Sequence, residues 1–190
     1  MGSESIKIKL IDTAISELIN GRWEQLTIKV LSTKTKIKVS QINKISSSKE
    51  GLLDLWSQNI NLKILEKVTL QELEEVTIKE RILELMLCRL DVLNEHKKEI
   101  LALMKLARKN GIESIRAFER IKKSMEYILN LSGGKIAGKK GALKIIVLSL
   151  IWIITLKDWS ELEEDDDSSV MSKLDKRLLI AEKLNNSLFV

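Results

Sequence analysis

The stretch LTIKVLSTKTKIKVSQINKISSSKEGLL, residues 26–53, is the part of the sequence from which the fold can be predicted. It contains two short apolar segments, at about 26–34 and 38–45, separated by about four residues. Thr27 stands just before the first segment, where its hydroxyl can cap a helix. Two short helices joined by a tight turn, with one helix before them and a long one after, are typical of a helix-turn-helix.

The rest of the chain also shows helical patterning. Residues 6–20 carry apolar side chains at i, i+3 and i+4, and Gly21 then offers a C-cap. Three serines at 46–48 can cap a long helix over 49–67. Further helical patterns lie at about 71–77, 78–93, 95–109, 112–131, 139–157 and 168–187. No segment alternates with period two, so we predict an all-α protein of about nine helices, with a module over 1–48 and a larger domain over 49–190.

The stretch around the predicted turn resembles the DNA-binding domain of the TetR family in register and without gaps. The positions that carry this resemblance are Thr27, Leu31-Ser32, Thr35-Lys36-Ile37 and Lys49-Glu50. The sequence departs from the family at the turn glycine, which is Lys36, and at two aromatic positions, which are Asn43 and Ile45. The resemblance implies a TetR-like fold, in which a C-terminal helical domain binds a ligand and forms the dimer.

Charge is concentrated in this module. The chain has a net charge of +5, and residues 1–50 contribute nine Lys and Arg against five Asp and Glu. Six lysines and no acidic residue lie between 29 and 49. Such a patch can neutralise DNA phosphates, although a lysine-rich composition from an AT-rich genome would look the same. The candidate DNA-binding residues are Thr27, Lys29, Lys38, Gln41, Asn43, Lys44 and Lys49.

Composition excludes several classes of chemistry. The 190 residues include one cysteine, Cys88, and one histidine, His96. They allow no intrachain disulfide framework and no His/Cys structural zinc site, and a histidine-based triad would need His96 itself. No serine lies in a Gly-x-Ser-x-Gly context. We therefore predict no enzyme, no metal and no cofactor, with Cys88 a buried thiol and His96 a residue near a helix start.

Three other segments have simple structural interpretations. Residues 133–140, GGKIAGKK, match the spacing of a phosphate loop but lack its final Ser or Thr and its preceding strand, so a helix–helix connection is expected. The acidic run 161–167 is expected to be a solvated loop. The longest apolar run, IIVLSLIWIITL at 145–156, has twelve residues, whereas a membrane span needs about 20. We expect a cytoplasmic protein, with peripheral attachment to the inner membrane face as the alternative.

A second resemblance covers about residues 10–185. Arg81-Ile82, Arg89-Leu90 and the run from His96 to Glu99 resemble a segment of the TetR-fold accessory family of coenzyme Q (ubiquinone) biosynthesis. The helix ending at Trp159 and the later Leu174-Asp175-Lys176-Arg177 are similar to that family as well. The resemblance implies a non-enzymatic dimer that binds lipids, such as isoprenoid quinone precursors, and presents them to a pathway enzyme at a membrane surface.

The central helices mix flexible methionine with leucine and phenylalanine, which suits an adaptable cavity and suits an ordinary core equally well. The predicted cavity residues are Met86, Leu90, Leu103, Met104, Leu106, Phe118, Met125, Ile128 and Trp152. The last two helices are apolar enough to pair across a twofold axis. The predicted dimer residues are Ile145, Leu148, Trp152, Leu174 and Leu178.

Three functions remain open from the sequence. The first is a non-enzymatic accessory protein that binds an apolar, lipid-like ligand in ubiquinone synthesis. The second is a TetR-type regulator that binds DNA through residues 27–49 under control of a small apolar ligand. The third is an interaction protein without a ligand, for which a filled core between the central helices would be the signature.

Overall fold

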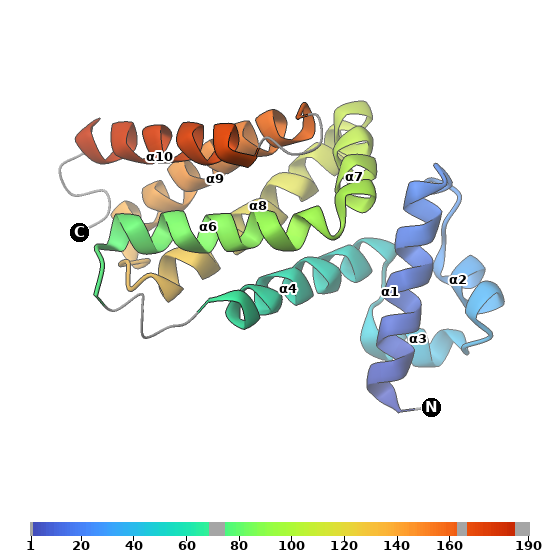
Figure 1. Ribbon diagram of the computed structural model, residues 1–190. Helices are drawn as coiled ribbons and strands as arrows, with labels where there is room; N and C mark the ends of the chain where they lie inside the picture. The colour runs from blue at the N-terminus through green and yellow to red at the C-terminus, as the bar shows by residue number, and fades with distance from the viewer. Residues whose placement is uncertain (1, 69–74, 163–166, 185–190) are drawn as a thin grey trace.

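The computed structural model describes residues 2–68, 75–162 and 167–184, and within them it contains nine helices and no strand (Figure 1). This confirms the all-α fold class predicted above. The helices are α1 (Ser3–Ile19), α2 (Ile28–Thr35), α3 (Val39–Ile45), α4 (Lys49–Lys67), α6 (Ile78–Asn94), α7 (Lys97–Lys109), α8 (Gly111–Leu131), α9 (Gly138–Ser160) and α10 (Asp167–Leu184).

The helices form a small module and a larger bundle that α4 connects. Figure 1 shows α1, α2 and α3 grouped at one end of the molecule, α6, α8, α9 and α10 towards the other, and α7 beside α1. Helix α1 packs against α2 within the module and against α4 and α7 outside it. In the bundle, α9 lies between α8 and α10, and α10 also contacts α6. Helices α4 and α7 are therefore the elements that link the bundle to the module.

The predicted caps of the helix-turn-helix are present. The Thr27 hydroxyl accepts a hydrogen bond from the backbone N–H of Val30 at 3.2 Å, and the Ser48 hydroxyl accepts one from Gly51 at 3.1 Å. Gly21 adopts a φ of +69° just after α1, as expected of a C-cap glycine. The residues that the sequence offers as helix caps therefore mark the observed ends of these helices.

Lys36, which replaces the turn glycine of the TetR family, ends α2 in a left-handed conformation with φ 59° and ψ 27°. It is the one non-glycine residue with positive φ in the described parts of the chain. A side chain in this region brings Cβ close to the following carbonyl oxygen, which costs free energy that glycine does not incur. The turn therefore carries some backbone strain at Lys36.

We expect Lys36→Gly to raise the free energy of unfolding by about 1 kcal/mol, because glycine relieves the left-handed strain. Lys36→Ala is the matched control, since it removes the same charge but keeps Cβ. Urea denaturation followed by circular dichroism measures both. An equal gain in the two variants would attribute the effect to charge and not to backbone conformation.

Glu17 links α1 to the rest of the module through hydrogen bonds. Its carboxylate accepts hydrogen bonds from Arg22 at 2.8 and 3.0 Å and from Lys34, on α2, at 3.1 Å. The hydrogen bonds from Arg22, and to a smaller extent the one from Lys34, lower the pKa of Glu17 from 4.5 to about 2. The charged form of Glu17 therefore stabilises the folded module.

This pKa predicts an acid dependence. Because the folded-state pKa lies below the ordinary value, the contribution of Glu17 is complete above about pH 4.5 and disappears as the pH falls towards 2. We expect wild type to be more stable than Glu17→Gln at pH 6, and the difference to shrink through this window. Thermal melts from pH 6 to pH 2 measure it, and a constant difference would contradict the assignment.

The remaining segment predictions have different outcomes. Most of the helix expected at 71–77 and of the acidic run at 161–167 lies outside the described residues. Residues 133–137 connect α8 to α9, as expected for the glycine-rich segment, and a helix precedes them in place of a strand. Within the described ranges, every helix is too short or too polar to cross a membrane.

Candidate functional site

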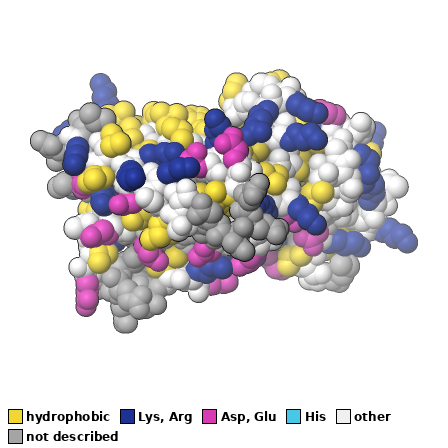
Figure 2. All heavy atoms as spheres, turned by 45° about the horizontal axis from the view of Figure 1, so that its top comes forward, with side chains coloured by type: hydrophobic (Ala, Val, Ile, Leu, Met, Phe, Trp, Pro, Cys, Tyr) yellow, Lys and Arg dark blue, Asp and Glu magenta, His cyan; other side chains and the backbone are white. Residues whose placement is uncertain are grey.

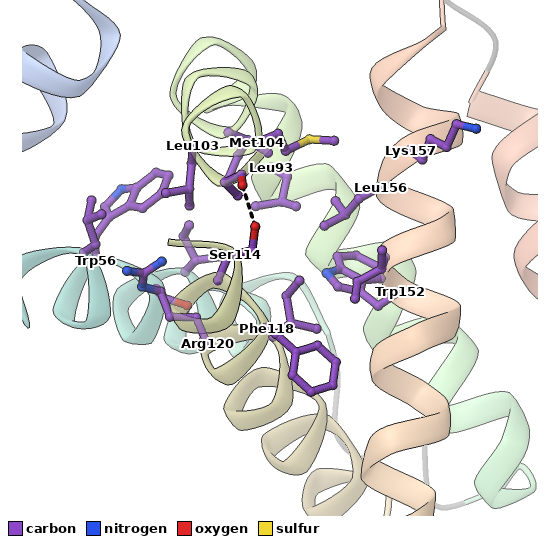
Figure 3. Close-up of a pocket in the computed structure, with 18 of the residues that line it drawn as sticks. Trp56, Leu93, Leu103, Met104, Ser114, Phe118, Arg120, Trp152, Leu156 and Lys157 are labelled. Atoms are coloured by element: carbon purple, nitrogen blue, oxygen red, sulfur yellow. Dashed lines mark hydrogen bonds between the residues drawn. The ribbon is translucent and has the colours of Figure 1, made fainter. Parts of the chain in front are cut away.

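A pocket of about 380 Å³, partly open to solvent, lies between five helices (Figure 3). Its size is at the lower end of the range typical of small-molecule sites. Helices α4, α6, α7, α8 and α9 all contribute side chains. The lining residues are Leu53, Trp56, Ser57, Ile60, Arg89, Leu93, Ile100, Leu103, Met104, Ala107, Arg108, Ser114, Ala117, Phe118, Arg120, Ile121, Trp152, Ile153, Leu156 and Lys157.

The wall of the pocket is mainly apolar. Figure 3 shows Trp56 on α4 and Leu103 on α7 at one side, and Phe118 on α8 with Trp152 on α9 at the other. The Ser114 hydroxyl joins α8 to α7 by donating a hydrogen bond to the carbonyl oxygen of Ala107 at 2.5 Å. Aromatic and aliphatic side chains on five separate helices can accommodate an apolar chain, provided that α7 and α8 keep this spacing.

Two buried arginines interrupt the apolar wall, and they differ in their partners. Arg120 Nε donates to Asp54 at 2.8 Å, and its Nη2 lies 3.8 Å from a Glu113 carboxylate oxygen. Arg89 donates a hydrogen bond to the Asn61 side-chain oxygen, and its guanidinium carbon lies 5.7 Å from the centre of a Trp152 ring. Burial lowers the pKa of Arg89 to about 10, so it remains charged at neutral pH.

The structure brings four of the nine predicted cavity residues to the pocket. These four are Leu103, Met104, Phe118 and Trp152. The other five do not line it: Met86, Leu90, Met125 and Ile128 are buried in the core of the bundle, and Leu106 is half-buried beside that core. The difference in position has a simple reason: a helical stripe of apolar residues identifies the inward face of a helix, but not which part of that face borders a cavity.

Sequence reasoning missed the charged residues of the pocket, although a signal was available. On α6, Arg89 continues the apolar stripe of Ile82, Leu85, Met86 and Leu93. An arginine at a position whose helical neighbours are all buried is unusual, because burying its charge costs free energy. The break in the stripe would have singled out Arg89 before the structure was known.

The predicted recognition helix, α3, is held by one buried side chain. Ile42 is fully buried, whereas Gln41, Asn43 and Lys44 are exposed. Thr27 is exposed as well, although its hydroxyl serves as the cap of α2. The polar face of α3 is thus open to solvent, and the buried Ile42 fixes its orientation.

The six lysines of this region fall into two groups. Lys34 pairs with Glu17, and Lys49 donates to the Trp23 carbonyl oxygen at 2.6 Å and lies 5.0 Å from the centre of the Trp23 ring. Lys49, predicted to contact DNA, therefore has a structural role inside the module. The others are exposed and form no ion pair with a described residue: Lys29, Lys36, Lys38 and Lys44. Figure 2 shows basic side chains over the module end of the molecule.

The dimer residues predicted from the sequence lie inside the subunit. Ile145, Leu148, Trp152, Leu174 and Leu178 are all buried against neighbouring helices of the same chain. Other parts of the surfaces of α9 and α10 carry exposed apolar side chains, and Figure 2 shows hydrophobic atoms over the bundle part of the molecule. These exposed residues are Leu143, Ile146, Leu150, Ile153, Ile154, Met171, Leu179 and Ile180.

The residues considered for catalysis are placed as follows. Cys88 is buried, and burial raises the pKa of its thiol to about 11. His96 lies at the start of α7, where its Nε2 is 3.3 Å from Lys63 Nζ and its ring meets the edge of Trp56. Among the described residues, no three His, Cys, Asp or Glu side chains cluster so that they could hold a metal.

The class that this architecture defines, a helix-turn-helix module joined to a helical bundle, is the TetR-like fold. Among solved structures, a TetR transcriptional regulator from Nitrosomonas europaea is similar, with a TM-score of 0.65 and 17% sequence identity. The match covers 94% of this chain and 98% of the other. The sequence matches no protein-family model and no curated protein. The similarity therefore establishes the fold.

Proposed function

We propose that this chain is a non-enzymatic protein that binds a lipid-like ligand in the pocket of its C-terminal domain. The observation that carries the proposal is the cavity itself, which lies between five helices of the bundle and is lined mainly by apolar and aromatic side chains. A filled core would favour an interaction protein without a ligand. Burial of an apolar chain against Trp56, Met104 and Phe118 would supply the main favourable free energy.

The resemblance to the coenzyme Q accessory family gives this function a more specific form. In that form the ligand is an isoprenoid or quinone-type lipid, and the protein presents it to an enzyme of ubiquinone synthesis. The resemblance rests on the positions quoted above, among them Arg89 on the pocket wall and His96 beside Trp56. Presentation at a membrane surface and the identity of the enzyme belong to the same proposal.

Extraction of the purified protein with organic solvent, followed by mass spectrometry, tests it. We expect a lipid in stoichiometric amount, and a prenylated species would support the ubiquinone form. The Ala117→Trp variant, in which an added ring fills the pocket, controls for lipid that adheres to the surface. Equal recovery from the two proteins would contradict binding in the pocket.

A second candidate function, ligand-controlled DNA binding, is favoured by a specific observation. Lys29, Lys36, Lys38 and Lys44 are exposed around the helix-turn-helix without an ion-pair partner in the described chain. Helices α4 and α7 both line the pocket and pack against α1. A ligand that shifts either helix would therefore change the orientation of the module. The pocket serves both functions, so only the DNA-facing surface distinguishes them.

We also propose that the protein is a homodimer formed by the exposed apolar faces of α9 and α10. Leu150 is 51% exposed and Ile180 is 56% exposed. A self-complementary twofold contact would bury both. We expect Leu150→Glu with Ile180→Glu to give monomers in sedimentation velocity. Ile112→Glu with Ile115→Glu, the same change on exposed residues of α8, should remain dimeric, and dimers of the first variant would contradict this interface.

A further inference from the structure

Arg89 differs from the other buried arginine of the pocket because, among the described residues, it forms no salt bridge with a carboxylate. Its side chain belongs to α6, is 5% exposed and forms part of the pocket wall. One hydrogen bond goes to the neutral Asn61 amide. The buried Nε–H has no hydrogen-bond partner. Within the described parts of the chain, Arg89 forms no ion pair.

The contrast with Arg120 is informative. Arg120 lines the same pocket, but Asp54 and Glu113 supply two carboxylates beside it. Its charge is therefore compensated by the protein. A buried guanidinium without an anion is costly, since water is lost and no opposite charge replaces it. A negatively charged ligand would supply the compensation that the described protein groups do not.

The position of Arg89 indicates which ligand would satisfy it. The guanidinium carbon lies 5.7 Å from the centre of a Trp152 ring, so the cationic group and the apolar wall meet at one place. The Nε–H itself is buried away from solvent, so it is the charge of the guanidinium, on a residue of the pocket wall, that a ligand would meet. Arginine binds carboxylate oxygens through charge-assisted hydrogen bonds, which are stronger than those to neutral acceptors. A neutral lipid would leave the charge of Arg89 uncompensated.

We propose that the pocket binds a single-chain lipid with a carboxylate head, whose carboxylate contacts Arg89 and whose apolar chain lies along Met104, Phe118 and Trp152. This inference rests on the proposed lipid-binding function and specifies the ligand class of the same site. Arg89 is thus a specificity-determining residue, because it favours an acid over the corresponding alcohol. Arg108 also lines the pocket, but it is exposed, so water can solvate its charge without a bound anion.

The test compares dodecanoate with dodecanol, by isothermal titration calorimetry below the micellar concentration at pH 7.5. The two probes share a chain and differ in the charge of the head. We expect wild type to bind dodecanoate at least about tenfold more tightly, as charge-assisted hydrogen bonds do. In Arg89→Met this preference should fall to within about threefold, with dodecanol binding unchanged. Arg108→Met is the matched control and should keep the preference.

Each outcome has a defined meaning. If neither probe binds to wild type, the proposed lipid-binding function fails. If wild type binds both probes equally, that function stands and the carboxylate inference is overturned. A preference that survives in Arg89→Met overturns the assignment of the head to Arg89. The wild-type comparison needs no variant, so the inference remains testable if Arg89→Met fails to fold, which circular dichroism would show.

Discussion

Replacing Ala117 with tryptophan is expected to abolish binding of lipid-like ligands while leaving the protein folded. Ala117 is half-buried on α8 and lines the pocket, so an indole ring there would occupy the space between α7 and α9. The position is partly open to solvent, which limits the strain of a larger side chain. We expect the affinity for dodecanoate to fall at least about a hundredfold, or roughly 2.7 kcal/mol.

The matched control is Ile115→Trp. Ile115 lies on the same helix, is 67% exposed and does not line the pocket. This variant adds the same ring outside the cavity, so calorimetry should give an affinity close to that of wild type. Binding by Ala117→Trp at wild-type affinity would place the ligand elsewhere in the molecule.

Reversing two charges on the helix-turn-helix is expected to eliminate any complex with DNA. Lys29 and Lys44 are exposed and form no ion pair with a described residue, so Lys29→Glu with Lys44→Glu changes the charge of this surface by four units. Loss of two phosphate contacts and repulsion from the phosphates should weaken binding at least about a hundredfold near 0.1 M salt. Fluorescence anisotropy with a labelled duplex measures it, and the salt dependence should become shallower.

The control for this prediction changes the same charges far along the chain. Lys123→Glu with Lys139→Glu alters two exposed lysines on α8 and α9, and DNA affinity should stay within a few-fold of wild type. Equal losses in the two double variants would indicate non-specific attraction to a basic protein. If wild type does not bind DNA at all, the regulator function is excluded and the lipid-binding function is unaffected.

The helix-turn-helix could be predicted from sequence because local chemistry determines it. Thr27 and Ser48 cap helices by bonds to backbone groups three residues away, and Gly21 provides positive φ. These signals depend on near neighbours in the chain. Even Lys36, where the expected glycine is missing, takes the left-handed conformation because the packing of α2 and α3 requires the turn.

The pocket and the subunit surface could be predicted only in part, because they depend on how helices rotate against each other. Met104 and Met86 have similar sequence surroundings, yet Met104 lines the cavity and Met86 is buried in the core. On α9 the run at 145–156 is apolar on all sides. Periodicity therefore could not distinguish Leu148, which faces inward, from Leu150, which faces outward.

The most direct test of the central claim is NMR of the protein with labelled methionine methyl groups, titrated with dodecanoate and, separately, with dodecanol. Met104 lines the pocket, whereas Met86 and Met125 are fully buried in the core outside it. If the cavity binds a lipid-like chain, the Met104 resonance should shift to saturation while those of Met86 and Met125 stay nearly unchanged. A Met104 resonance that does not respond to either probe would contradict the account.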